Sequence, residues 1–403
     1  MNQPRIQLLD LLRGIALLGI LLMNIRLFSA PEAAYFSPLV YGEQLQLNKI
    51  WWTLQYFIAD QKFMAIFSML FGASTALICD RLDAKGLCAW RIYTRRLLVL
   101  LLIGLLHAYL IWHGDILVFY ALCGVIPFVF RHLNWRICIM FGLLCLGVGS
   151  LKSYLTYLSM VSLPAAIQQQ IITQSLPGMI QVSETEIAAL NGSWAQQLSY
   201  RISAAWHFHT DVLPNWGIWR VSGMMLLGLG LYRCGFLRGQ FSILFYQQTA
   251  WTGIISGMLL SLYGYYLNEQ TAWQFPHYFF GHTLFNYWGA VCTAVGLIAL
   301  ITLWQASGCC QPLARFIQGI GRTALSNYLL QSILCTAFFY GVWGFARMPP
   351  YLTALVVVIV WLLQFLLTHW WLQTHAKGPV EALWHLATYA KVPGLTEKKP
   401  QTR

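Results

Sequence analysis

The feature that most constrains this chain is a succession of ten apolar stretches, each long enough to cross about 30 Å of hydrocarbon as a helix. Of its 403 residues, 58% are hydrophobic and 9% are charged, whereas an ordinary soluble domain has about 25% charged residues. The sequence therefore predicts an all-α, polytopic membrane bundle whose third and fourth helices are joined by a tight turn. The ten predicted spans lie near residues 8–28, 57–79, 97–113, 115–132, 137–158, 212–232, 246–267, 283–304, 323–345 and 351–373.

The net charge of +12 does not indicate a nucleic-acid partner, because Lys and Arg alternate between loops and do not form one basic surface. With a cytoplasmic N-terminus, the basic loop at residues 81–96 and the segment from Lys377 onwards fall on the same side. The positive-inside rule then places both termini in the cytoplasm. The first apolar run lacks a small-residue cleavage site, so we expect it to remain as a helix.

The ten cysteines lie within predicted spans or on the basic side of the membrane. A chain built for an oxidising compartment would place them in its external loops, so we expect no structural disulfides. Cys309 and Cys310 lack the spacing and the second pair that are typical of a zinc site. We therefore expect no metal.

A polar insert divides the hydrophobic sequence into two blocks. The predicted organisation is a five-helix membrane half at 1–158, an external polar insert at 159–211, a second five-helix half at 212–390 and a disordered cytoplasmic tail at 391–403. Ile and Leu mixed with Gln and Glu in the insert predict one or two short amphipathic helices near the bilayer surface.

Polar residues inside the first apolar stretch form the first candidate site. Asp10, Arg13 and Asn24 lie within about 60° of one another on one helix face. A charge at membrane depth costs about 2.5–3.5 kcal/mol or more, and such groups are usually paired or line a cavity. Either Asp10 pairs with Arg13 near the cytoplasmic interface, or Arg13 faces an anionic ligand that enters from the cytoplasm. Asn24 would lie about 16 Å further along the helix, near its external end.

Two histidines and a carboxylate surround the predicted tight turn. His107 lies within the third span, and His113, Gly114 and Asp115 form the turn into the fourth. A single His in an apolar helix is more often a packing residue than a catalyst, but a nearby carboxylate could hold either histidine as a general base. We favour His107 as the base, because burial keeps its imidazole neutral, and we expect His113 to lie in a solvent-accessible turn.

Polar residues at three other positions enter predicted spans. Lys62 opens a span from the external side, where an interfacial anchor is the simpler interpretation and a substrate contact the alternative. Arg322, Asn327 and Gln331 enter a span from the cytoplasmic side. Asn327 and Gln331 share a helix face, which hydrogen bonding between helices would explain, and contact with the substrate is the alternative. Gly378 to Glu381 predict a turn followed by an interfacial helix.

Several motifs in the same order carry a resemblance that covers nearly the whole chain. The segments are LDLLRGIALLGILLMN, KFMAIFSMLFGAS, LLHAYLIWHGDILVFYALCG, GRTALSNYLLQS and GPVEALWHLATY. Together they resemble the YeiB-like family of bacterial inner-membrane proteins, classed as domain of unknown function 418, some of which carry a transport-associated label. This resemblance implies a multi-pass protein of the bacterial inner membrane.

The first helix is also similar to that of acyltransferase 3 and heparan-glucosaminide acetyltransferase proteins, which begin with an Asp-x-x-Arg helix followed by His or Asn. Asp10, Arg13 and Asn24 match this pattern. The similarity implies an acyl-CoA donor, such as acetyl-CoA, approached from the cytoplasm and an acceptor, often a sugar, on the far side. The glucosaminide branch has its catalytic His before the second helix, but residues 25–56 contain none, so His107 or His113 would have to replace it.

These observations lead us to expect a transmembrane acyltransferase. In this hypothesis a His base held by Asp115 deprotonates the acceptor, Asn24 stabilises the oxyanion, and Arg13, next to Asp10, binds donor phosphates with help from Arg322. The alternatives are a transporter of small molecules or lipids, with the buried charges lining its pathway, and a purely structural membrane protein. The expected partners are membrane lipids and a small-molecule acceptor or solute, and a homo-oligomer is compatible with the sequence.

Overall fold

A computed structural model describes residues 7–41 and 46–389 of this chain, so the predicted tail at 391–403 lies outside the described residues. All regular secondary structure in these two ranges is helical. The elements before the polar insert are α1 (Gln7–Ser29), α2 (Glu32–Phe36), η1 (Pro38–Tyr41), α3 (Gln46–Ile58), α4 (Lys62–Asp83), α5 (Ala89–Leu110), α6 (Leu117–Cys123), α7 (Val125–Phe130) and α8 (Trp135–Val161).

The insert and the second half of the chain complete the bundle. The insert forms α9 (Ala165–Leu190), α10 (Trp194–His207) and the π-helical segment η2 (Phe208–Gly217). The remaining elements are α11 (Ile218–Arg233), η3 (Phe236–Arg238), α12 (Ile243–Gln270), η4 (His277–Gly281), α13 (Thr283–Ser307), α14 (Gln311–Arg322), α15 (Ala324–Thr336), η5 (Ala337–Val342), η6 (Pro350–Leu352), α16 (Thr353–Leu372) and α17 (Pro379–Tyr389).

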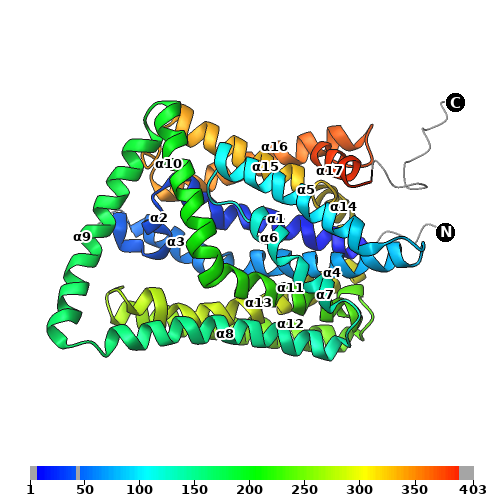
Figure 1. Cartoon of the computed structure of the whole chain (residues 1–403), viewed down its shortest axis with the longest axis horizontal. Coiled ribbons are helices and arrows are strands. Elements are labelled where there is room, and N and C mark those ends of the chain that lie inside the picture. The colour runs from blue at the N-terminus through cyan, green and yellow to red at the C-terminus, as the bar shows by residue number, and fades with distance from the viewer. Residues whose placement is uncertain (1–6, 42–45, 390–403) are drawn as a thin grey trace.

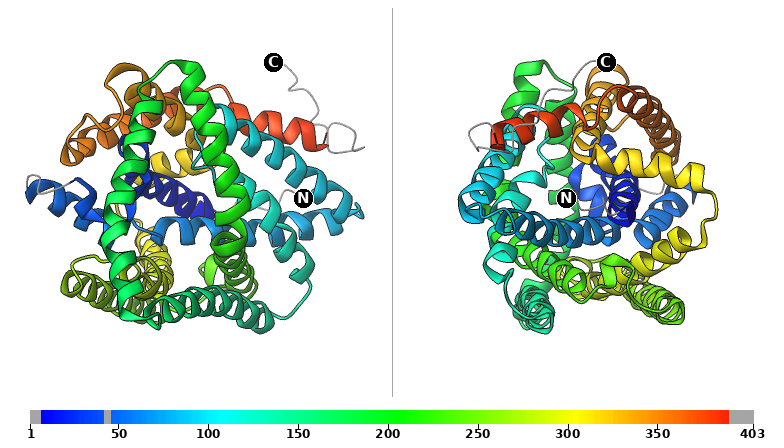
Figure 2. Two further views of the ribbon diagram at one scale, coloured as in Figure 1. Left: turned by 60° about the vertical axis from the view of Figure 1, so that its left-hand side comes forward. Right: turned by 90° about the vertical axis from the view of Figure 1, so that its right-hand side faces the viewer.

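The long helices run side by side and define two ends of the molecule (Figure 1). The first turn of α1 and helix α17 lie at one end, here called the α17 end, and α9 crosses the opposite end, the α9 end. Viewed along the bundle, α1 lies inside a ring formed by other helices (Figure 2). Its apolar side chains are accordingly among the most buried of the core.

Six helical stretches in the described ranges are long and apolar enough to cross a membrane. They support a membrane protein, while the count of ten spans stays a prediction. Helix α12 has 28 residues but falls outside this set because Gln, Ser and Tyr side chains lower its mean hydropathy. The six stretches are Gln7–Ser29, Gln46–Asp83, Ala89–Leu110, Trp135–Val161, His277–Ser307 and Pro350–Leu372.

Two of the predicted spans are interrupted in the structure. The predicted span at 115–132 is divided at Gly124 into α6 and α7. The predicted span at 57–79 includes a break after α3, where Gln61 has a left-handed φ of 61° before α4 begins. A continuous apolar run does not reveal such breaks, because hydropathy is insensitive to the backbone angles of single residues.

Glycines allow α4 and α11 to pack with almost no space between their backbones. A Cβ atom added to Gly72 of α4 would lie 1.8 Å from the carbonyl oxygen of Met225, and one added to Gly228 of α11 would lie 1.8 Å from that of Met69. Small residues at such crossings let membrane helices approach closely and gain van der Waals contact. This contact joins the two halves of the chain.

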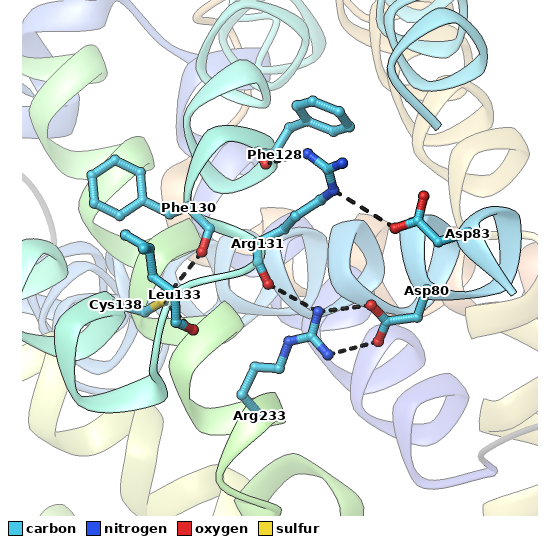
Figure 3. A network of polar contacts seen from close by, with 8 residues as sticks. All are labelled: Asp80, Asp83, Phe128, Phe130, Arg131, Leu133, Cys138 and Arg233. Atoms are coloured by element: carbon cyan, nitrogen blue, oxygen red, sulfur yellow. Dashed lines mark hydrogen bonds and ion pairs between the residues drawn. The ribbon is translucent and has the colours of Figure 1, made fainter. Parts of the chain in front are cut away.

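Ion pairs join three segments at the α17 end (Figure 3). Arg233, in the last turn of α11, donates two 2.7 Å hydrogen bonds to the carboxylate of Asp80 and a third, of 2.9 Å, to the carbonyl oxygen of Arg131. The Arg131 guanidinium in turn lies 4.0 Å from the Phe128 ring centroid. The fork geometry of Arg233 fixes α11 to both α4 and the segment that follows α7.

The polar insert is helical, but α9 is 26 residues long and not short as predicted. Only Ser183, Glu186 and Leu190, near its C-terminal end, are buried. One carboxylate oxygen of Glu186 accepts a 3.1 Å hydrogen bond from the backbone N–H of Glu32 in α2. This bond attaches α9 to the segment that follows α1.

Glu186 makes the attachment of α9 dependent on pH. Burial, with a smaller contribution from the charge of Glu32, raises the pKa of its carboxyl to about 7 against the opposing effect of the hydrogen bond from the Glu32 amide. The pKa in the unfolded chain is about 4.3, so the folded form is stabilised by protonation. This stabilisation is fully present below about pH 4.3 and is lost as the pH rises towards 7.

We therefore expect Glu186→Gln, which cannot ionise, to be more stable than the wild type at pH 8 and nearly equal to it at pH 4.5. The difference in unfolding free energy at pH 8 should be about 2–4 kcal/mol. Thermal unfolding of the purified protein at both pH values measures this. Glu184→Gln removes an exposed carboxyl from the same helix and should show no such pH dependence; equal pH profiles for both variants would contradict the prediction.

Candidate functional site

The most enclosed polar pair of the first half is formed by His107 and Asp115. Nδ1 of His107 lies 2.7 Å from Oδ1 of Asp115, and both side chains are completely inaccessible to solvent. The other carboxylate oxygen, Oδ2, accepts a 2.8 Å hydrogen bond from the backbone N–H of Val118 in α6. Asp115 therefore orients the imidazole and satisfies a free amide in the first turn of a helix.

The local sequence explains how the two side chains meet. His107 lies in the last turn of α5, and residues 111–116 form the predicted tight turn before α6 begins at Leu117. A Cβ atom added to Gly104, one turn before His107, would lie 2.8 Å from the backbone nitrogen of Val118. The absence of a side chain at Gly104 thus lets the start of α6 approach α5 closely enough for the pair to form.

The second ring nitrogen of His107 has the properties of a proton acceptor. If Nδ1 donates to the carboxylate, Nε2 carries the free lone pair, and it is buried with no hydrogen-bond partner in the described ranges. Aromatic rings cover it: the ring centroids of Tyr328 and Trp112 lie 5.2 and 6.4 Å from that of His107. A reactant can reach Nε2 only if this aromatic cover moves.

His113 does not lie in a solvent-accessible turn, and that prediction was wrong. The residue is 7% exposed, and its ring meets the Tyr200 ring of α10 edge-on at 5.8 Å. Helix α10 is also fixed here, because Arg201 donates a 2.8 Å hydrogen bond to the carbonyl oxygen of Leu110. The polar insert covers the turn. The hydropathy of the turn residues alone does not predict this cover. Asp115 is paired with His107, and His113 faces α10.

A third histidine, which was not predicted from the sequence, lies near this pair. His209, in η2, has a buried Nε2 atom with no partner in the described ranges, and its ring lies 5.8 Å from Tyr109 and 6.3 Å from Phe119. The charge of Asp115 acts on it. The segment His207-Phe208-His209 was a visible signal, but its place in the polar insert concealed its proximity to α5 and α6.

Asp10 and Arg13 form an ion pair at the α17 end, on the inner helix α1. Nη1 of Arg13 lies 3.0 Å from Oδ1 of Asp10, and Nη2 donates a 2.7 Å hydrogen bond to Oγ of Ser74 in α4. The Arg13 side chain is 24% exposed, whereas that of Asp10 is 5% exposed. The pairing expected from the i, i+3 spacing is therefore present, and part of the Arg13 side chain is exposed at this end of the molecule.

Two more arginines lie at the same end. Helix α14 packs closely on α1: a Cβ atom on Gly321 would lie 1.8 Å from the carbonyl oxygen of Asp10. This close packing brings the adjacent Arg322 to the first turns of α1. Nη2 of Arg322 donates a 3.0 Å hydrogen bond to the carbonyl oxygen of Ala376. Arg96, which the sequence analysis did not single out, lies close enough to Arg13 for the two charges to interact.

Asn24 lies on α1 towards the α9 end and is 7% exposed. One turn further on, the Phe28 ring packs 4.0 Å from the Trp112 ring, between centroids, so this half of α1 contacts the turn that follows His107. No hydrogen bond joins Asn24 to His107 in the described part of the chain. The structure therefore brings the two residues to one region without placing them in contact.

Lys62 is not an interfacial anchor, because its side chain is completely buried. Nζ donates hydrogen bonds to the carbonyl oxygen of Tyr56 and to Oδ1 of Asn286, both of 3.0 Å. Asp60 accepts a 2.7 Å hydrogen bond from Nδ2 of the same Asn286. The apolar residues of α13 and α4 cover the lysine, which its position at a helix start does not predict.

Asn327 and Gln331 join α15 to α16 and α1. Nδ2 of Asn327 donates to Oγ1 of Thr368 at 3.0 Å, and Nε2 of Gln331 donates to Oε1 of Gln364 at 3.0 Å and to the carbonyl oxygen of Leu17 at 3.3 Å. These contacts agree with the interpretation as hydrogen bonding between membrane helices.

Helix α17, predicted from the turn at Gly378, connects α15 with α5. One carboxylate oxygen of Glu381 accepts a 2.7 Å hydrogen bond from the backbone N–H of Leu325 in the first turn of α15, and the other accepts one from Oγ of Ser326. The indole N–H of Trp384 donates to the carbonyl oxygen of Arg96 at 2.9 Å, while the Arg96 guanidinium lies 3.5 Å from the ring centroid. The carboxylate also complements the positive end of the α15 dipole.

No group of three or more His, Cys, Asp or Glu side chains in the described ranges could hold a metal ion. The polar groups instead form two regions. The His107–Asp115 pair lies between α5 and α6 under the insert, and Arg13, Arg96 and Arg322 lie at the α17 end. The fold and these two regions define a polytopic helical membrane protein with a buried His–Asp pair.

Comparison with known proteins identifies the family. Residues 231–391 match the family described as Protein of unknown function (DUF418). The chain is 31% identical over 393 residues to the uncharacterized protein YeiB of Escherichia coli (strain K12), an alignment that covers 94% of this chain and 95% of YeiB. It is 27% identical over 419 residues to the uncharacterized protein YxaH of Bacillus subtilis (strain 168), covering 99% and 98% of the two chains. No solved structure matches. The chain belongs to the YeiB-like, DUF418 family.

Proposed function

We propose that this protein is a transmembrane acyltransferase of the bacterial inner membrane, which moves an acyl group from a cytoplasmic acyl-CoA-type donor to an external acceptor such as a sugar. The observation that carries the proposal is the fully buried His107–Asp115 pair with a free Nε2 atom. A carboxylate bound to Nδ1 holds the imidazole in the tautomer that a general base needs.

The proposed reaction is a direct transfer. Nε2 of His107 accepts the proton of an acceptor hydroxyl or amine while the acceptor oxygen or nitrogen bonds to the acyl carbon. The carbon–sulfur bond of the thioester then breaks, and the proton passes to the departing thiolate. Asn24 donates a hydrogen bond to the oxyanion that forms on the acyl oxygen. This step requires movement of the aromatic cover formed by Tyr328 and Trp112.

The arginines at the α17 end suit the donor. Arg13 is partly open to that end, and Arg96 and Arg322 add positive charge beside it. A planar guanidinium binds phosphate oxygens through two parallel hydrogen bonds. Helix α1 extends from this end to the region of Asn24, about 16 Å away, so one helix would support both the donor phosphates and the reacting acyl group.

Thermal unfolding of the purified protein with acetyl-CoA and longer acyl-CoAs tests donor binding. A ligand that binds only the folded state raises the unfolding temperature by a few degrees at about a hundredfold excess over its Kd. Arg13→Lys keeps the positive charge but loses the two parallel N–H donors of the guanidinium. We therefore expect the rise in unfolding temperature caused by acyl-CoA to fall by more than half, while the unfolding temperature without ligand changes little.

The matched control for this experiment is Arg136→Lys, at an exposed arginine near the same end, which should keep the full shift. An unfolding temperature of the wild type that does not respond to any acyl-CoA would contradict the proposal. Equal loss of ligand-free stability and ligand response in Arg13→Lys would favour a structural role for this residue.

A second candidate function is transport of a small solute. Asp60, Lys62 and Arg220 are buried charges between α4, α11 and α13, and such charges often line ion or substrate pathways. A transporter of unrelated solutes should not respond to acyl-CoA, so the same unfolding experiment separates the two candidates.

A further inference from the structure

Two oppositely charged residues, Asp60 and Lys62, lie at the start of α4, near the α9 end. The side-chain amide of Asn286 forms hydrogen bonds with both of them. Asn286 of α13 accepts a hydrogen bond from Lys62 on Oδ1 and donates one to Asp60 from Nδ2. Tyr35 donates a further hydrogen bond to the second oxygen of Asp60, and Ser261 of α12 donates to Oδ1 of Asn286 at 2.9 Å. The charges of Asp60 and Lys62 therefore cancel within a fully bonded group.

Arg220 of α11 lies beside this group and forms no ion pair with any of the described residues. Its side chain is 0% exposed, and Nη1 donates a 2.9 Å hydrogen bond to the carbonyl oxygen of Tyr287. The guanidinium carbon lies 4.1 Å from the centroid of the Tyr287 ring. Nε and Nη2 have no hydrogen-bond partner in the described ranges. The charge of Asp60 acts on Arg220, and the charges of Asp60, Arg220 and Arg26 act on Lys62.

The two unpartnered nitrogens belong to the same edge of the guanidinium. Nε–H and one N–H of Nη2 are parallel, and this edge is the one that binds an anion with two hydrogen bonds. The sum of charges on Asp60, Lys62 and Arg220 is +1. An unpaired charge in such a setting is strongly destabilising, and a water molecule can accept the hydrogen bonds but cannot neutralise the charge.

We propose that the free edge of Arg220 binds one small monovalent anion, of the size of chloride or formate, between α4, α11 and α13. A single charge matches the surplus of this group. A small ion is required because Arg220 and Lys62 expose no surface, so a larger molecule would have to separate the helices. The carbonyl oxygen and the ring of Tyr287 hold the arginine in place.

The test is the unfolding temperature of the purified full-length chain in sodium chloride, bromide, formate or gluconate at one ionic strength and pH. We expect the three small anions to raise the unfolding temperature by about 3 °C over gluconate, saturably with concentration. Arg220→Gln should abolish this difference. In gluconate it should be at least as stable as the wild type, because a buried charge without a partner has been removed.

Arg201→Gln is the matched control, since Arg201 is also buried and also bonds to a backbone carbonyl, and it should keep the anion response. A general salt effect on the protein would act on both variants equally. If the Arg220 variant does not fold, anomalous scattering from bromide-soaked crystals of the wild type gives the answer, with a peak expected at Nε and Nη2. Equal stability in all four salts, an unchanged response in Arg220→Gln, or no bromide peak at this edge would overturn the proposal.

Discussion

Replacing His107 with alanine should reduce acyl transfer by at least about 10²–10⁴-fold, because the variant has no group to remove the proton of the acceptor. The donor site at Arg13 lies near the other end of α1, so the acyl-CoA shift in unfolding temperature should remain. The measurement is transfer of a radiolabelled acyl group from acyl-CoA to acceptors in membranes that contain the variant, together with acyl-CoA binding to the purified protein.

His113→Ala is the control, because His113 is also buried but faces Tyr200 and not Asp115. It should retain acyl transfer to within about tenfold of the wild type, since it removes packing but no proton acceptor. Full transfer activity in His107→Ala would remove the proposed base and favour the transport function. Loss of both transfer and acyl-CoA binding in His107→Ala would instead indicate a structural role for the pair.

The largest expected effect on stability comes from Gly72→Ala. The added methyl group would lie 1.8 Å from the carbonyl oxygen of Met225 and 2.7 Å from its carbonyl carbon, so α4 and α11 must separate. Overpacking against side chains usually costs about 1–3 kcal/mol, and backbone atoms have less freedom to move than side chains. We expect a loss of about 3 kcal/mol or more, measured as a lower unfolding temperature or as absence of folded protein in detergent extracts.

Gly147→Ala is the matched substitution, because Gly147 also lies in a long apolar helix, α8, and a methyl group there meets nothing within 4 Å. Its unfolding temperature should equal or slightly exceed that of the wild type, since Ala favours the helix over Gly by about 1 kcal/mol. If Gly72→Ala proves as stable as Gly147→Ala, the close contact between α4 and α11 does not limit stability.

The sequence predicted the helical class and the positions of most long helices, because hydropathy averages over many residues. The tight turn between His107 and Asp115 was also predictable, since a short polar segment separates two apolar runs. The break at Gln61 was not, because it depends on the left-handed φ of one residue. The division at Gly124, whose own backbone angles stay close to helical, was not predicted either. The burial of His113 depends on α10, which is distant in the sequence and covers the turn only in the folded chain.

The candidate site was predicted in its residue types but not in its pairings. The i, i+3 spacing identified the Asp10–Arg13 pair, since both residues are on one helix. The choice of His107 over His113 as the partner of Asp115 depends on the direction of the turn, which spacing alone leaves open. Arg220 gave no signal, because an arginine near a helix start usually reaches solvent, and only the packing of α13 and α4 encloses it.

The two carboxylate oxygens of Asp115 bind different parts of the molecule, one the imidazole of His107 and the other the amide of Val118. Any substitution at position 115 therefore alters the ring orientation and the start of α6 together. Asparagine at position 115 keeps one oxygen acceptor. It can therefore bind either the His107 imidazole or the Val118 amide as aspartate does, but not both. The orientation of His107 cannot be re-engineered from Asp115 alone; a redesign would first have to supply another acceptor for the Val118 amide.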